Sequence, residues 1–187
     1  MNNQSEQILT AAYSCIAEKG YANVSLREIA TEAGVALSQL HYYYGSKKDL
    51  FKAVILKVIN QYLHEFKEFL QKNKNSISDV SNLVTYVQSM IVENPELFRV
   101  FYDLSSLALW SESFKTLLTD LFKDLTLVIE ECLDPSQMNE TLREYSPNAI
   151  ARIILGAIFG VGLQYSLDPK SNSEMIKTLS AVPDIIK

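Results

Sequence analysis

The sequence predicts an all-α protein on the basis of three observations. Apolar residues recur at the three- and four-residue spacing of helices along most of the chain, and we find no stretch with the alternation of a strand. Glycines and prolines tend to stand where such stretches begin or end. The 187 residues, 48% of them hydrophobic, suffice for a full core and fit one compact unit or two small helical modules.

The first fifty residues predict three helices and the start of a fourth. The first helix runs from Gln4 to Gly20, a glycine that ends it. Ser25 is placed to cap the second helix, with Glu28 completing a capping box, and Gly34 ends that helix. A third helix is expected over Ala36–Tyr43. Two helices joined by a tight turn with glycine form the supersecondary unit that reads DNA.

A long fourth helix is expected over residues 47–73. Ser46 and Asp49 form a second capping pair at its start, and its broad apolar stripe must contact both parts of the chain. Residues 73–78 are polar and predict a loop. Further helices are expected over residues 79–93, 95–110, 113–133, 146–167 and 173–186, the last one disturbed near its end by Pro183.

An ordered set of residues across the first four helices resembles a known family. The set comprises Ile8-Leu9-Thr10-Ala11-Ala12, Gly20-Tyr21, Val24-Ser25-Leu26-Arg27-Glu28-Ile29-Ala30, Ala33-Gly34-Val35, Leu40, Tyr43-Tyr44 and Ser46-Lys47-Lys48-Asp49-Leu50. It is similar to the helix-turn-helix of the TetR (tetracycline-repressor-like) transcriptional regulators. A bare helix-turn-helix pattern is weak evidence, whereas this longer set is specific. The resemblance covers about the first quarter of the chain, and the remainder agrees only in length and helical pattern.

The resemblance implies a division of labour along the chain. Residues 1–46 would form a three-helix DNA-binding domain and residues 47–187 a ligand-binding and dimerisation domain, with the helix 47–73 connecting the two. The expected function is that of a dimeric regulator, most often a repressor, which binds a near-palindromic operator and is released by a small molecule. The expected partners are therefore double-stranded DNA, an effector and a second copy of the chain, in the cytoplasm and without a cofactor.

DNA contacts are expected at nine positions between the second and fourth helices. They are Ser25, Arg27, Leu37, Ser38, Gln39, His41, Tyr42, Tyr43 and Lys47. Lys47 corresponds to the family's phosphate-binding lysine, at a helix start where backbone N–H groups also favour an anion. Tyr42 and Tyr43 correspond to positions that touch the DNA backbone. Gln39 is placed to reach a base edge as hydrogen-bond donor and acceptor together.

Several of these positions also have an interpretation without DNA. Arg27 reaches a phosphate or pairs with Glu28 or a neighbouring acid, and Ser25 caps its helix, touches a phosphate, or does both. His41 contacts DNA or takes part in aromatic packing, and Tyr44 is expected to pack inside the domain. The sequence does not specify the operator.

Two further sets of residues concern the C-terminal part. The resemblance implies an internal ligand site, for which the candidates are Phe66, Met90, Phe98, Tyr102, Asp103, Trp110 and Phe114. Asp103, or alternatively Glu112, would contact a cationic or hydroxylated ligand, and simple packing or surface exposure is the alternative for each residue. The dimer interface is placed at Ile153–Leu167 and Met175–Ile186, with the candidates Ile153, Gly156, Ala157, Gly160, Gln164, Met175 and Leu179. Glycines inside a helix cost about 1 kcal/mol relative to alanine, so close helix approach, between chains or within one, is their expected reason.

The charge distribution leaves a second function open. The net charge is −5, yet the charges of residues 1–52 cancel, so the excess negative charge lies beyond them. A neutral N-terminal module, without a basic stretch in Met1–Gln7, also fits a helical ligand- or protein-binding module whose DNA-binding part is degenerate.

Other classes of function lack residues to carry them. We find no nucleophile–base pair and no phosphate loop, so an enzyme is not expected. Cys15 and Cys132 fit small buried residues better than a disulfide or redox pair, and neither His41 nor His64 has metal-site neighbours. Met1–Gln7 does not have the character of a secretory signal. The most apolar run, Ile153–Leu163, is shorter than the roughly 20 residues that cross a bilayer.

Overall fold

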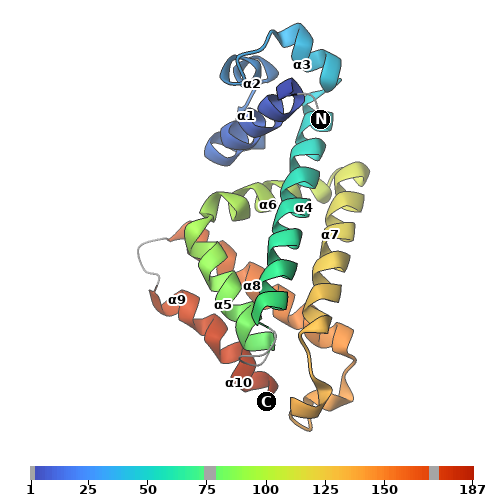
Figure 1. Cartoon of the computed structure of the whole chain (residues 1–187), viewed down its shortest axis with the longest axis vertical. Coiled ribbons are helices and arrows are strands. Elements are labelled where there is room, and N and C mark those ends of the chain that lie inside the picture. The colour runs from blue at the N-terminus through green and yellow to red at the C-terminus, as the bar shows by residue number, and fades with distance from the viewer. Residues whose placement is uncertain (1–2, 74–78, 169–172) are drawn as a thin grey trace. The chain divides into compact units, whose positions relative to one another are not determined.

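The computed structural model describes residues 3–73, 79–168 and 173–187, and no strand is present in those residues (Figure 1). The α-helices are α1 (Asn3–Lys19), α2 (Leu26–Glu32), α3 (Leu37–Tyr43), α4 (Lys47–Asn73), α5 (Asp79–Glu93), α6 (Pro95–Ala108), α7 (Glu112–Glu131), α8 (Pro147–Leu167), α9 (Ser173–Lys177) and α10 (Val182–Ile186). Short 3-10 helices are η1 (Tyr21–Asn23), η2 (Pro135–Gln137), η3 (Leu142–Glu144) and η4 (Thr178–Ala181). The prediction of an all-α fold is confirmed.

Local capping and breaking residues explain why most helices begin and end where the sequence predicts. Helices α4 and α5 have the predicted bounds, and α8 begins after Ser146, whose Oγ accepts the Ala149 N–H at 3.2 Å. The last helix differs from the prediction, because the chain forms α9, η4 and α10 in place of one helix over 173–186. Pro183 lies in the first turn of α10, since a proline is excluded from a helix interior. Of the loop predicted for residues 73–78, the structure describes only Asn73, and residues 74–78 lie outside the described residues.

The chain divides into two compact units. Unit 1 comprises Met1–Tyr62 and Arg99–Leu118, and unit 2 comprises Leu63–Phe98 and Thr119–Lys187. Helices α4, α6 and α7 each contribute residues to both units. The predicted functional boundary between residues 46 and 47 is a different kind of division, and it stays a prediction.

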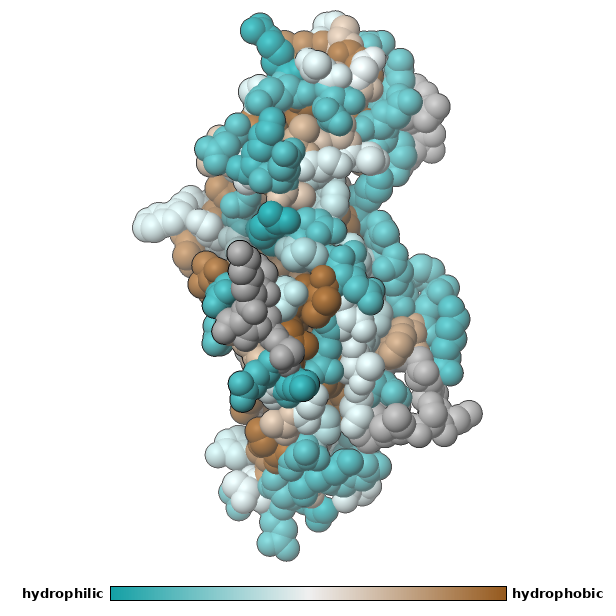
Figure 2. Space-filling model, turned by 90° about the vertical axis from the view of Figure 1, so that its left-hand side faces the viewer, coloured by the Kyte–Doolittle hydropathy of each residue, from teal (hydrophilic) through white to brown (hydrophobic). Residues whose placement is uncertain are grey.

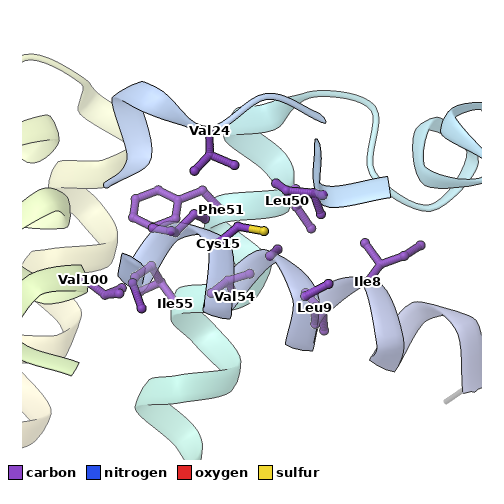
Figure 3. Close-up of a cluster of buried hydrophobic side chains, with 14 of the residues drawn as sticks. Ile8, Leu9, Cys15, Val24, Leu50, Phe51, Val54, Ile55 and Val100 are labelled. Carbon is purple, nitrogen blue, oxygen red and sulfur yellow. The ribbon is translucent and has the colours of Figure 1, made fainter. Parts of the chain in front are cut away.

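Unit 1 has an aliphatic core closed by three aromatic rings. Its fully buried side chains come from each of the first four helices, and include Ile8, Ile16, Ile29, Leu40, Leu50 and Phe51. Figure 3 shows Phe51 among these residues, together with Val100, which comes from α6. The Phe51 ring lies 4.6 Å from the ring of Tyr21 and 5.6 Å from that of Phe114. Residues of α6 and α7 thus complete the core around the helix-turn-helix.

Unit 2 packs the middle and the end of the chain together. Its largest fully buried side chains are those of Leu83, Ile91, Ile129, Ile150 and Leu179. Gln88 Nε2 donates at 2.9 Å to the Ile176 carbonyl and to Ser180 Oγ, which ties α5 to the segment of α9 and η4.

Helix α8 is longer than the apolar run that the sequence analysis singled out. It continues beyond Ile153–Leu163 on both sides, and its 21 residues are long and apolar enough to cross a membrane. The run Ile153–Leu163 itself remains shorter than a membrane span, whereas the whole helix that contains it is not. One such helix in the described residues is nevertheless weak evidence for a membrane span, because core helices of water-soluble proteins have the same length and composition.

Candidate nucleic-acid interface

A capping box fixes the start of α2. The Glu28 N–H donates to Ser25 Oγ at 3.2 Å, and the Ser25 N–H donates to Glu28 Oε2 at 2.8 Å. The Ser25 backbone N–H, and to a smaller extent the Ser25 side chain, stabilise the charged form of the exposed Glu28 carboxyl and hold its pKa below its usual range. The predicted capping box is confirmed.

The turn between α2 and α3 requires a glycine because of its backbone conformation, and not because a larger side chain would collide with a neighbour. Gly34 has a φ of 66°, in the left-handed region, and a methyl group at this position would meet no atom of the described residues within 4 Å. The Val35 N–H then donates to the Ala30 carbonyl at 3.0 Å and closes the turn. The sequence prediction of a tight reversal at Gly34 is confirmed.

Helix α3 packs one side against the domain and leaves the other exposed. Leu40 is fully buried, and Tyr44 Oη lies 2.9 Å from Ser5 Oγ on α1. Tyr44 thus packs inside the domain through its ring and its hydroxyl. Leu37 and Tyr43 are half-buried, while the remaining predicted contacts on this helix are exposed, namely Ser38, Gln39, His41 and Tyr42, the last with 84% of its surface exposed. An exposed polar side of one short helix is suited to a major groove, which admits a single helix.

Gln39 has a bond that the sequence analysis did not anticipate. Its Oε1 accepts the N–H of Ala36 at 3.0 Å, the residue that precedes α3. Whether Gln39 offers a donor and an acceptor together to a base is not tested by this bond and stays a prediction, although the oxygen is turned to the Ala36 backbone. The Nε2 amide is the part of the side chain that is not engaged by Ala36.

Lys47 lies against η1 at the start of α4. Its Nζ is 4.5 Å from the centroid of the Tyr21 ring and donates to the Ala22 carbonyl at 3.4 Å. Partial burial lowers the pKa of Lys47, opposed by the negative charges of Glu28 and Asp103. Because an ammonium group has three N–H donors, Lys47 can bind a phosphate while it keeps the bond to the Ala22 carbonyl.

The structure bears on the alternative roles of Arg27 and Ser25, the two predicted phosphate contacts at the start of α2. Glu28 pairs with Lys19 at 3.5 Å rather than with Arg27. Arg27 and Ser25 are both exposed, and Ser25 acts as the helix cap. Whether either also contacts a phosphate is not tested by these contacts and stays a prediction.

The seven predicted ligand-binding residues are divided between the units. Phe66, Met90 and Phe98 belong to unit 2, with Phe66 and Phe98 buried. The other four, Tyr102, Asp103, Trp110 and Phe114, belong to unit 1. Burial raises the pKa of the Tyr102 hydroxyl.

Three of those predictions need correction. The side chain of Trp110 is 89% exposed, so it does not line an interior site. Phe114 is a core residue of unit 1, in contact with Tyr21 and Phe51. Asp103 Oδ2 accepts the Tyr21 N–H at 2.6 Å, so its carboxylate holds η1 rather than standing ready for a ligand. Glu112, the alternative acid, pairs with Lys115 at the surface.

Asp103 has a structural contact that sequence reasoning did not anticipate. Its partner Tyr21 lies far away in the sequence, so no local pattern reveals the bond. A carboxylate within the otherwise apolar stretch of α6 was the available signal, because a half-buried carboxylate needs a hydrogen-bond donor.

The predicted dimer residues of α8 lie on an open side of the helix. Ile153 is 65% exposed, Gly156 and Gln164 are exposed, and Ala157 and Gly160 are half-exposed. Met175 on α9 is also half-buried. Leu179 has to be removed from this set, because only 1% of its surface is exposed and it belongs to the core of unit 2. The residues described by the structure contain no cluster of three His, Cys, Asp or Glu side chains that would hold a metal ion.

Comparisons with known proteins agree with this geometry. Residues 8–54 match the family of bacterial regulatory proteins described as the tetR family. An HTH-type transcriptional regulator from the lacX 3' region of Lactococcus lactis subsp. lactis is 27% identical over 95% of this chain and 93% of its own.

Solved structures share the whole fold. A transcriptional regulator from Saccharomonospora viridis in complex with choline matches with a TM-score of 0.83 and 19% identity, over 98% of this chain and 97% of its own. The regulator FadR from Bacillus subtilis in complex with stearoyl-CoA matches with a TM-score of 0.74 and 17% identity, over 96% of each chain. The matching family is one of DNA-binding regulators, not of enzymes. The helix-turn-helix and its supporting helices in residues 8–54 are therefore those of the TetR family of bacterial transcriptional regulators.

Proposed function

We propose that this regulator is a cytoplasmic homodimeric repressor that binds a near-palindromic operator. Residues 1–46 form the DNA-binding domain, and residues 47–187 form the ligand-binding and dimerisation domain. The exposed polar side of α3, held by Leu40 and Tyr44 on its other side, is the observation that carries the proposal. In a dimer, two such helices enter successive major grooves about 34–36 Å apart, so the two half-sites would repeat with inverted orientation.

The open side of α8 supports the dimer. A methyl group at Gly156 or Gly160 would meet no atom of the described residues within 4 Å, so packing within the described chain does not account for these glycines. Ile153, Leu163 and Leu167 are large apolar residues exposed on the same helix. Figure 2 shows more generally that hydrophobic residues reach the surface of the protein. An exposed apolar surface beside small residues suits close approach of a second helix.

The interior of unit 2 favours an effector with a large apolar part. Phe159 lies 5.7 Å from Phe122 and 6.4 Å from Phe98, measured between ring centroids. Among the described residues of this unit, the buried polar side chains are those of Asn82 and Thr126, and neither carries a charge. Burying a charged group there without a partner would be costly, whereas an apolar chain would pack against the rings. The effector releases the operator by binding better to the form that does not fit DNA.

Footprinting on the DNA that flanks the protein's own gene tests the regulator. A protected near-palindrome is the expected result, and protection that is indifferent to sequence would instead support a degenerate DNA-binding domain. Stearoyl-CoA and choline then serve as probes of opposite character in thermal unfolding and in operator release. We expect stearoyl-CoA to act and choline not to, and the reverse would contradict the proposed apolar effector.

A further inference from the structure

The carboxamide of Gln39 has one fixed orientation in this structure. A backbone N–H only donates, so the atom of Gln39 that faces the Ala36 N–H at 3.0 Å has to be the oxygen. The nitrogen, with its two N–H donors, points elsewhere on an exposed side chain. The identity of the two ends of the amide is thus settled by the chemistry of the partner.

The bond to Ala36 also has a reason to persist on DNA. Ser25 caps α2 with its own side chain, and Ser46 caps α4 through Oγ, which accepts the Asp49 N–H at 3.1 Å. Ala36 has no side-chain acceptor to offer α3, so the Gln39 bond is the only half of a capping box that α3 can form. Releasing it would leave the start of α3 without a side-chain hydrogen bond to its backbone.

A glutamine with an occupied oxygen reads a different set of bases. Bidentate recognition of adenine needs the oxygen on the adenine N6 amine and the nitrogen on N7, both at the edge of one base. An oxygen turned back to the Ala36 backbone does not reach that edge together with the nitrogen. Guanine presents two acceptors, N7 and O6, and thymine presents O4. Adenine presents the acceptor N7 beside the N6 donor, and cytosine presents a donor, so in both of these bases a donor opposes the Gln39 amine.

We propose that Gln39 is a specificity-determining residue that reads its base pair as a hydrogen-bond donor only, selecting guanine first and thymine second over adenine and cytosine. This inference rests on the proposed docking of α3 in the major groove. The expected preference for guanine over adenine is about five- to tenfold, at the lower end of what a good side chain–base pair provides.

Selection from a random duplex library, with the full chain and its variants, tests the proposal. In Gln39→Glu the carboxylate still accepts the Ala36 N–H, so the fold and the thermal midpoint are retained, but the donor is replaced by an acceptor. We expect one base pair in each half-site to change, from guanine to cytosine. Gln39→Met, which lacks both polar atoms, is the matched control and should show no preference at that same pair.

Ala36→Pro provides the converse test. Proline has no N–H, and the φ of −68° at Ala36 already suits its ring. The freed oxygen should then allow bidentate recognition, and the selected base should change from guanine towards adenine. If Ala36→Pro does not fold, the base selected by Gln39→Glu alone decides whether Gln39 acts only as a donor.

The outcomes separate this inference from the proposed function. Adenine selected by the unmodified chain at the pair that Gln39→Glu changes, or base preferences left unchanged by Gln39→Glu, would overturn the donor-only reading while leaving a sequence-specific regulator. Selection of no sequence by the unmodified chain would overturn both.

Discussion

Helices α3 and α8 each leave one side exposed, and the chemistry of the two sides is opposite. The exposed side of α3 carries Ser38, Gln39, His41 and Tyr42, whereas that of α8 carries Ile153, Gly156, Leu163, Gln164 and Leu167. Polar side chains are stable in water and can exchange their water contacts for contacts in the hydrated groove of DNA. An aliphatic surface is unfavourable in water and is stabilised when an apolar partner covers it. Exposure alone therefore does not identify a function, but exposure together with side-chain chemistry assigns a different kind of partner to each helix.

The largest expected effect comes from filling the open side of α8. In Gly160→Leu the added side chain starts in open space, so each chain should fold with unchanged or slightly higher stability. A second helix would no longer approach closely, so the dimer should dissociate. Operator affinity should fall by about a hundredfold, because two linked half-site contacts become independent.

Analytical ultracentrifugation and operator titration measure these two consequences. Thr119→Leu, which adds the same side chain at an exposed position of α7, is the matched control and should remain dimeric. A Gly160→Leu chain that stays dimeric and binds as before would show that α8 does not need a close partner.

A smaller effect is expected from the residue that supports α3 from α6. Asp103→Ala leaves the Tyr21 N–H without its carboxylate acceptor, and an unsatisfied half-buried donor costs about 2 kcal/mol. Chemical denaturation measures the loss in free energy of unfolding. Asp120→Ala removes the same charge at an exposed position of α7, and an equal loss in both variants would mean that the Tyr21 bond contributes nothing.

The comparison of the two helices also shows what a sequence can predict. The bounds of α4 and α5 and the capping box at Ser25 follow from signals a few residues apart, and the structure has them as predicted. The buried side of α3 follows equally from helical spacing. Which side of a helix is buried could be predicted, because the spacing of apolar residues within that helix determines it.

Contacts between distant residues could not be predicted in the same way. Asp103 bonds to Tyr21, and Phe114 joins the core around Phe51, through the path of the chain rather than through any local pattern. Trp110 shows the converse error, because a large apolar residue is expected inside yet this one is exposed at the end of α6. The ligand set included these three residues because it relied on residue type without tertiary placement.

A further prediction concerns the lysine beside α3. Lys47→Ala should weaken operator binding about equally for all sequences and lower the salt dependence by about one unit for each bound chain, because one phosphate contact is lost. Titrations at several salt concentrations measure the slope. Lys67→Ala removes the same charge further along α4 and should leave the slope unchanged. A changed base preference in Lys47→Ala would mean that Lys47 contacts a base.

The smallest expected effect is a pH dependence at the helix that precedes α3. Bonds from Ser25 lower the pKa of Glu28 in the folded chain, so the charged form is favoured by folding. Its contribution is complete above the unfolded pKa of about 4.3 and is lost as the pH falls through the folded value. Glu28→Gln keeps an oxygen for the Ser25 N–H but has no charge to lose.

The difference in unfolding midpoint between the parent chain and Glu28→Gln should therefore be present at pH 7 and decrease as the pH falls below about 4.3. Thermal unfolding across this range measures it. In a Ser25→Ala background the difference should shrink, because the Ser25 side chain no longer helps to stabilise the charged Glu28 carboxylate. A difference that stays constant with pH would mean that Glu28 supports α2 through its shape and hydrogen bonding alone, and that the placement of α3 does not depend on charge at this cap.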